Sequence, residues 1–150
     1  MSLTLPAQLS LPATSGHTFS LSDSAKPLVL YFYPKDNTPG YTTESMDFRD
    51  AYADFVAAGC QVWGLSRDSI KSHENFKAKL SLPFDLISDP DEIACAAFGV
   101  MKLKNMYGKQ VRGIERSTFV LGEGGSVLRE WRGVKVPSHV AEVLAFVNTL

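Results

Sequence analysis

The fold of this chain is decided by the stretch Tyr31-Phe-Tyr-Pro-Lys-Asp-Asn-Thr-Pro-Gly-Tyr-Thr-Thr-Glu44. It begins inside a hydrophobic strand, residues 28–33, which is apolar on both faces as a central strand of a sheet is. A polar loop with two prolines follows, and an amphipathic helix is expected from about residue 43 to 58. Since a helix N-terminus carries unpaired N–H groups and a positive dipole end, it stabilises an anion near position 41. Such a loop is a natural reaction site.

Strand and helix patterns alternate beyond this stretch. Strands are predicted at residues 60–66 and 84–87. Helices are predicted at residues 69–80 and from a start at residues 89–92 to a stop at Gly99. Residues 117–121 and 127–131 flank a glycine-rich turn, which indicates an antiparallel hairpin. A last helix is expected after Pro137-Ser138, and residues 100–113 are expected to form a basic loop.

The order of these elements predicts the fold class. Early strand–helix alternation implies parallel strands with right-handed crossovers, and the late hairpin adds antiparallel strands. Ser15-Gly16-His17 is typical of a turn between two short strands. We therefore expect an α/β, thioredoxin-like sandwich: a central mixed β-sheet flanked by helices, with an N-terminal β-hairpin extension. At 150 residues the chain is expected to be one domain, residues 1–150.

Composition and charge restrict the function classes. The net charge is −1, with 15 basic and 16 acidic residues interspersed, which argues against a nucleic-acid or anionic-membrane surface. No apolar run reaches the ~20 residues of a membrane helix. The first residues lack the basic and apolar regions of a signal peptide. Two cysteines in such a chain suggest free thiols in a reducing cytoplasm.

The central stretch also carries a recognisable motif. Pro34-x-x-x-Thr38-x-x-Tyr41 resembles the active-site signature of the peroxiredoxins, Pro-x-x-x-Thr-x-x-Cys, with tyrosine replacing cysteine. Its surroundings, Tyr-Pro-Lys-Asp-Asn-Thr-Pro-Gly and then Thr-Thr-Glu, are similar to the Q-type group, also called bacterioferritin comigratory proteins. Further matches follow in order over most of the chain: Ser66-Arg-Asp-Ser, Lys71-Ser-His-x-x-Phe76, Lys104-Asn-Met-Tyr-Gly-Lys-Gln110 and Ile114-Glu-Arg-Ser-Thr-Phe119. The resemblance implies the thioredoxin-like fold as well.

The resemblance implies a reaction. In this family a cysteine thiolate attacks the O–O bond of a peroxide and becomes a sulfenic acid. The implied activity is reduction of hydrogen peroxide and organic hydroperoxides by a monomeric enzyme, with electrons from thioredoxin or a similar thiol and without cofactor or metal. Tyr41 then stands at the position of the reacting, peroxidatic cysteine. Arg116 matches the arginine that polarises the peroxide and supports the thiolate.

Four further residues take supporting roles under the same resemblance. The hydroxyl of Thr38 is expected to face the pocket of position 41, and Pro34 matches the proline that shields it. The backbone N–H of Gly40 is a potential donor, and Glu44 is expected to hold an arginine in place. Thr38, Glu44 and Arg116 also have simpler structural interpretations: a turn hydroxyl, a helix-dipole partner and half of a surface ion pair, respectively.

Tyr41 cannot replace a thiolate, because a phenol has a reference pKa near ~10 and no sulfur to oxidise. Its ring is also expected to fill the peroxide pocket or to distort the first helical turn. We therefore expect this chain to have little or no peroxidase activity. The rival interpretation is a catalytically silent thioredoxin-fold binding module. Another thioredoxin-like oxidoreductase is disfavoured because the chain has no Cys-x-x-Cys.

The remaining cysteines and histidines offer few alternatives. The family places a resolving cysteine at positions that are Met46 and Lys77 here, so the parent enzyme would use one cysteine and an external thiol. Cys95 is the remaining candidate for a resolving thiol, and Cys60 is expected to pack in the core. The three histidines show no metal-ligand spacing and are interpreted as surface or packed residues.

Overall fold

The computed structural model describes residues 10–20, 27–36, 39–106, 108–122, 126–135 and 138–150; for residues 39–42, 104–106 and 111 it describes the backbone only. Along the chain lie β1 (Ser10–Pro12), η1 (Thr14–Gly16), β2 (Thr18–Ser20), β3 (Leu28–Phe32), α1 (Pro39–Ala57), β4 (Gln61–Ser66), α2 (Ile70–Leu80), β5 (Leu86–Ser88), α3 (Ile93–Phe98), β6 (Met101–Met106), β7 (Lys109–Ile114), β8 (Ser117–Leu121), β9 (Val127–Arg132) and α4 (His139–Val147).

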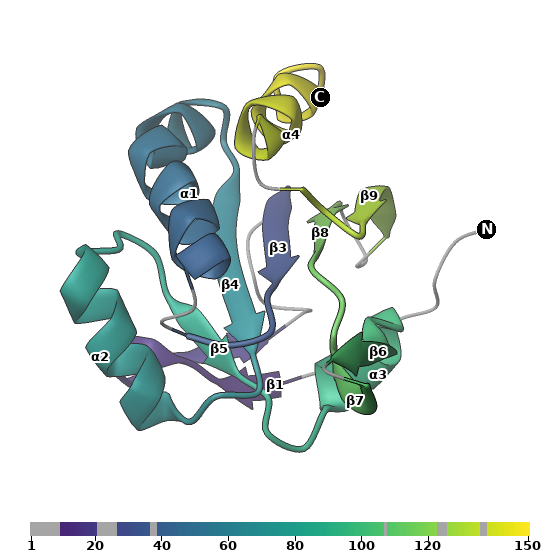
Figure 1. Cartoon of the computed structure of the whole chain (residues 1–150). Helices are drawn as coiled ribbons and strands as arrows, with labels where there is room; N and C mark the ends of the chain where they lie inside the picture. The colour runs from purple at the N-terminus through teal and green to yellow at the C-terminus, as the bar shows by residue number, and fades with distance from the viewer. Residues whose placement is uncertain (1–9, 21–26, 37–38, 107, 123–125, 136–137) are drawn as a thin grey trace.

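A five-stranded sheet in the order β5-β4-β3-β8-β9 forms the centre of the molecule (Figure 1). Its middle strand, β3, pairs in parallel with β4 and antiparallel with β8. The predicted central mixed sheet is therefore confirmed. The predicted N-terminal hairpin is confirmed too: β1 and β2 pair antiparallel around η1.

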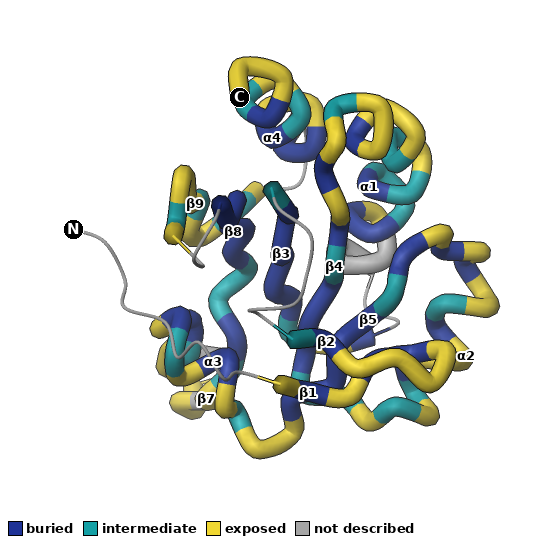
Figure 2. Tube along the Cα trace, turned by 180° about the vertical axis from the view of Figure 1, so that it is seen from behind, coloured by how far each residue is buried: buried dark blue, intermediate teal, exposed yellow. Residues whose placement is uncertain are grey.

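The side chains of β3 pack into two separate apolar layers, because alternate side chains of a strand point to opposite faces of the sheet. Val29 and Tyr31 face the layer that contains α1, α2 and α4. Leu30 and Phe32 face the layer that contains the β1–β2 hairpin and α3. All four side chains are fully buried, and the hairpin and α3 come forward when the molecule is seen from behind (Figure 2). Helices therefore cover both faces, as the predicted sandwich requires.

A glycine in β4 brings α1 close to the sheet. Gly64 lies opposite Tyr31 in the β3–β4 register. A Cβ at Gly64 would lie 2.7 Å from Cζ of Tyr31 and 2.7 Å from Cδ2 of Leu86. The tyrosine ring occupies that space, and its hydroxyl hydrogen-bonds Oγ of Ser45 on α1 at 3.0 Å.

The loop predicted for residues 100–113 is wrong. This segment forms a two-stranded antiparallel hairpin, β6–β7, in which Met101 pairs with Ile114. The two strands form a sheet of their own, separate from the five-stranded sheet, and Lys102 and Leu103 are both exposed. Its described side chains are mostly exposed, so the segment lacks the clean apolar alternation that predicts a strand.

Helix α1 begins earlier than the sequence suggested. It starts at Pro39, a residue that favours the first helical position because its fixed φ suits a helix and its missing N–H has no partner there. The predicted cap at Thr42 or Thr43 is therefore wrong, and position 41 lies in the first helical turn. The third strand is also shifted, to Leu86–Ser88.

Candidate active site

The chain leaves β3 at a loop that leads directly to α1. The N–H of Tyr33 donates to the carbonyl of Leu65 at 3.1 Å, which extends the β3–β4 ladder by one residue. Pro34 is then partly exposed at the strand end, and Asp36 is buried. Thr38 lies outside the described residues, so the contact expected of its hydroxyl stays a prediction.

The first turn of α1 contains Gly40 and Tyr41. Backbone N–H groups at this point of a helix have no intrahelical acceptor and point toward the N-terminal side. Position 41 shares a helix face with Glu44, three residues later.

Glu44 meets a cation from a distant part of the chain. Its carboxyl is fully buried, and Oε1 lies 3.7 Å from Nε of Arg116, whose side chain is 15% exposed. Arg116 comes from the connection between β7 and β8. Burial raises the pKa of Glu44 to about 8, although Arg116 opposes the rise and Asp47 adds to it. Among the described residues, neither carboxyl oxygen has a hydrogen-bond partner.

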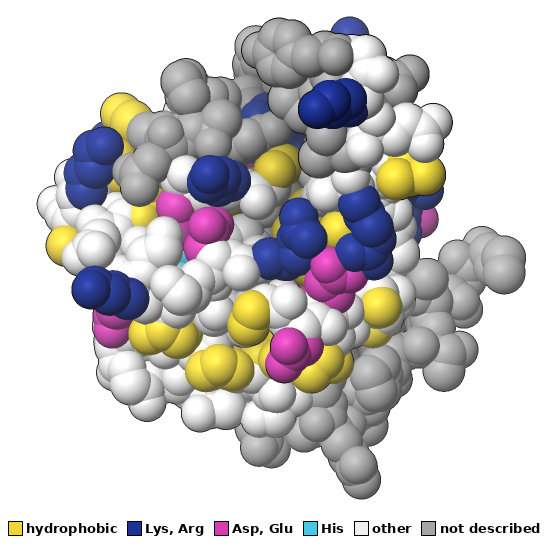
Figure 3. All heavy atoms as spheres, turned by 60° about the horizontal axis from the view of Figure 1, so that its bottom comes forward, with side chains coloured by type: hydrophobic (Ala, Val, Ile, Leu, Met, Phe, Trp, Pro, Cys, Tyr) yellow, Lys and Arg dark blue, Asp and Glu magenta, His cyan; other side chains and the backbone are white. Residues whose placement is uncertain are grey.

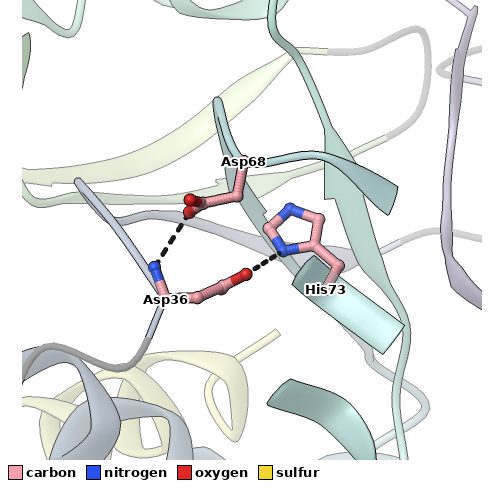
Figure 4. Close-up of side chains that lie close together, drawn as sticks. All are labelled: Asp36, Asp68 and His73. Carbon is pink, nitrogen blue, oxygen red and sulfur yellow. Dashed lines mark hydrogen bonds and ion pairs between the residues drawn. The ribbon is translucent and has the colours of Figure 1, made fainter. Parts of the chain in front are cut away.

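A second buried carboxylate, Asp36, holds the loop itself. Its oxygens accept hydrogen bonds from the hydroxyls of Tyr33 at 2.6 Å and Ser72 at 2.8 Å. Nδ1 of His73 on α2 lies 2.8 Å from Oδ2 (Figure 4). The Asp36 N–H donates to Asp68 at 2.8 Å. The sequence analysis missed this network.

His73 is fully buried, so it is a packed residue as the sequence suggested. Its Nε2 atom lies 2.9 Å from the carbonyl oxygen of Ile87 in β5. Among the described residues, Asp36, Asp68 and His73 are the one group whose ligand-type atoms all lie within 4.8 Å. Both His73 nitrogens and both Asp36 oxygens already have hydrogen-bond partners, so the group is a hydrogen-bonded network.

The two cysteines lie in the core. Cys60 is 2% exposed, and burial raises its pKa to about 12. Cys95 on α3 is fully buried, and burial raises the pKa of its thiol further, with help from the carboxylate of Asp89. That carboxylate also accepts the N–H groups of Ile93 and Cys95 at the start of α3. Neither thiol has the lowered pKa of a reactive nucleophile.

Another buried histidine lies beside the arginine. Nε2 of His139 forms a 2.8 Å hydrogen bond with Oγ1 of Thr118. Burial lowers the pKa of His139 to about 4; Glu142 opposes this shift, and Arg116 contributes to it. His139 is therefore neutral at physiological pH, and Arg116 is the cation of this region.

Charges of both signs are distributed over the surface. On the face in Figure 3, Lys and Arg side chains alternate with Asp and Glu. In the hairpin β6–β7, Arg112 pairs with Glu92, which also binds Arg67. Within the described residues, the helices are all too short or too polar to span a membrane.

Comparison with known proteins gives consistent matches. The AhpC/TSA family model matches residues 4–129. Peroxiredoxin Bcp of Xanthomonas campestris is 52% identical over 97% of this chain and 85% of that protein. Peroxiredoxin Bcp of Bacillus subtilis is 49% identical over 91% of this chain and 87% of that protein. A solved structure of the Xanthomonas campestris bacterioferritin comigratory protein, described with an alkyl peroxide reduction activity, superimposes with a TM-score of 0.92 at 51% identity and covers 98% and 96% of the two chains.

Proposed function

The chain belongs to the AhpC/TSA family as a Q-type peroxiredoxin of the bacterioferritin comigratory group, and we propose that position 41 is the place where its scaffold would carry the reacting sulfur. The proposed substrates are hydrogen peroxide and organic hydroperoxides, and the proposed reductant is thioredoxin or a similar thiol. With Tyr41 at this place, the chain as it stands has little or no peroxidase activity.

The observation that carries this proposal is the pairing of Arg116 with Glu44. It brings a cation from the β7–β8 connection to the first turns of α1, on the helix face that position 41 shares. A cation beside a helix N-terminus stabilises a thiolate and polarises a peroxide oxygen, since both effects favour negative charge at one point. These are the requirements of nucleophilic sulfur chemistry.

The reaction proposed for a cysteine at position 41 balances as follows. The thiolate attacks one peroxide oxygen, a sulfur–oxygen bond forms and the O–O bond breaks. The second oxygen leaves with the bonding electron pair and takes up a proton as water or an alcohol, while the sulfur becomes a sulfenic acid. An external thiol then forms a mixed disulfide with release of water, and a second thiol releases the enzyme thiol. Arg116 and the helix N–H groups stabilise the charge on the leaving oxygen.

Glu44 contributes to this arrangement through its protonation. Because burial raises its pKa to about 8, the carboxyl is mostly neutral at pH 7. The positive charge of Arg116 is then not cancelled by Glu44, and it acts on the anion at position 41 instead. A protonated Glu44 therefore lies beside Arg116 without cancelling its charge.

With Tyr41 in place, the chain is either an enzyme scaffold that lacks its nucleophile or a binding module without activity. Without sulfur at position 41 the oxygen-transfer step has no acceptor, and the buried, high-pKa thiols of Cys60 and Cys95 do not substitute for it. If the surrounding site has also diverged, the alternative function is a catalytically silent binding module with this fold. Cytoplasmic localisation and a monomeric state remain predictions.

The test is a single turnover with one equivalent of peroxide. The chain and its Tyr41→Cys variant are mixed with hydrogen peroxide and a sulfenic-acid trap, and the labelled site is mapped by mass spectrometry. The proposal predicts label at position 41 of the variant and no label on the unaltered chain. Label on Cys60 or Cys95 in the unaltered chain would overturn the assignment of position 41.

A further inference from the structure

The buried carboxylate of Asp36 links the loop before α1 to helix α2, and the reaction assigned to position 41 does not itself use this carboxylate. We propose that Asp36 is a positioning residue for that reaction: anchored by Tyr33, Ser72 and His73, it fixes the start of α1. This inference rests on the proposed function, because the geometry it controls is that of the proposed site.

The contacts of Asp36 are expected to hold the loop firmly, because several donors bind one buried carboxyl group. The Asp36 side chain is 1% exposed, and that of His73 is fully buried. Three side-chain donors, from Tyr33, Ser72 and His73, converge on its two oxygens. Leaving such donors unpaired in a buried site is costly. The loop conformation is therefore tied to this one carboxylate.

The anchor also joins segments that are distant in sequence. His73 and Ser72 belong to the first turns of α2, and the other ring nitrogen of His73 contacts the Ile87 carbonyl in β5. Through its own N–H, Asp36 binds the carboxylate of Asp68, which also accepts a hydrogen bond from Ser66 at the end of β4 at 2.6 Å. Asp36 is held by both its main chain and its side chain.

The position of Asp36 gives it control over the site. Only Asn37 and Thr38 separate it from Pro39, the first residue of α1. A displacement of Asp36 is therefore expected to pass to the first helical turn. A misplacement of about 1 Å in a reacting group costs up to roughly a hundredfold in rate.

Asp85, directly before β5, offers a matched control that also binds a residue of α2. Its carboxylate accepts from Thr14 at 2.8 Å, His17 at 2.6 Å and Lys77 at 2.6 Å, and its side chain is 14% exposed. It therefore also has three side-chain donors, one of them on α2. These contacts tie α2 to the N-terminal hairpin, and they do not include the loop at residues 34–36.

The experiment places Asp36→Ala, Asp36→Asn and Asp85→Ala in the Tyr41→Cys background. For each protein three quantities are measured: the melting temperature, the rate of oxidation of the position-41 thiol by hydrogen peroxide, and its rate of alkylation by iodoacetamide. Rates are taken well below melting, so that they describe folded protein. Asparagine keeps one acceptor oxygen for Tyr33 but turns an N–H₂ donor toward Ser72 and His73, so it tests whether the second acceptor oxygen is needed.

Both alanine variants are expected to melt at lower temperature, but only Asp36→Ala is expected to slow oxidation, by roughly ten- to a hundredfold. It is also expected to change the alkylation rate, and Asp36→Asn, which keeps only one acceptor oxygen, is expected to fall between Asp36→Ala and the parent in both rates. Equal rates in folded Asp36→Ala and Asp85→Ala would overturn the proposal, because Asp36 would then only stabilise the fold.

Two further readouts keep the test decisive. If the Tyr41→Cys variant is not oxidised at all, the proposed function fails, while the alkylation rates still decide whether Asp36 positions the helix start. If Asp36→Ala does not fold, Ser72→Ala removes one donor and is expected to shift both rates in the same direction. In the unaltered chain, Ser72→Ala is expected to speed amide hydrogen exchange at residues 43–46, whose N–H groups are the first to bond within α1. Unchanged exchange at these residues, together with unchanged oxidation and alkylation rates, would refute the proposal.

Discussion

The Nε atom of Arg116 lies 3.7 Å from Oε1 of Glu44, a carboxyl group with no exposed surface. The two residues come from parts of the chain more than seventy positions apart. Their meeting places a cation beside the first turns of α1. The charged form of the buried Glu44 is unfavourable, since desolvation is the largest cause of its raised pKa.

Stability is expected to fall with rising pH through Glu44. Its folded-state pKa of about 8 exceeds the ordinary value of 4.5, so the folded protein holds a proton that the unfolded chain releases. This contribution is complete below pH 4.5 and is lost as the pH rises to about 8, at no more than ~1.4 kcal/mol per pH unit. Urea unfolding between about pH 5 and 8 should show that the Glu44→Gln variant loses less stability than the unaltered chain as the pH rises. Parallel pH profiles for the two proteins would contradict the assignment.

Arg116→Ala in the Tyr41→Cys background is expected to raise the thiol pKa and slow oxidation by peroxide about a hundredfold. The reason is the loss of the cation that supports both the thiolate and the leaving oxygen. The thiolate absorbance as a function of pH and the oxidation rate measure the two effects. Arg112→Ala is the control, because Arg112 pairs with Glu92 on the surface hairpin. A similar effect of both substitutions would mean that Arg116 acts only through overall charge.

Gly64→Ala is expected to destabilise the protein by about 1–3 kcal/mol, because the new Cβ would collide with Tyr31 and Leu86. Gly113→Ala is a matched control in another strand, where a Cβ has no atom within 4 Å. Chemical unfolding of both variants measures the difference. Equal stabilities would show that the Tyr31 ring does not depend on the space at Gly64.

The thiols of Cys60 and Cys95 are expected not to react with an alkylating reagent in the folded protein. Both are buried, and the pKa of each is raised, so little thiolate is present or accessible. Both should react once urea unfolds the chain. Rapid modification of Cys95 under native conditions would instead revive its candidacy as a resolving thiol.

Much of the scaffold was predictable because its signals are local. The apolar run of β3, the proline-rich loop and the glycine-rich β8–β9 turn each mark their element within a few residues. Gly59 ends α1 as expected, with a positive φ of 75°. By contrast, the described side chains of β6–β7 are mostly exposed, so this segment shows no strand pattern. Helix α1 begins at Pro39, whereas the sequence indicated a start at a threonine.

The site was predictable in part. The motif and the resemblance named Pro34, Arg116 and Glu44, yet only the structure shows the burial that raises the pKa of Glu44. The contact between Asp36 and His73 joins residues 37 positions apart, so no local periodicity indicates it. The only sequence signals for this contact are an aspartate after a strand and a histidine on the apolar face of a helix.

The most direct test of the central claim is steady-state peroxide consumption with thioredoxin and its reductase, comparing the chain with Tyr41→Cys. The account predicts turnover by the variant and none by the unaltered chain, because the site keeps Arg116 and the helix N-terminus but lacks sulfur at position 41. Turnover by the unaltered chain would contradict the assignment of position 41. No peroxide consumption by either protein would contradict the claim that the rest of the site is intact.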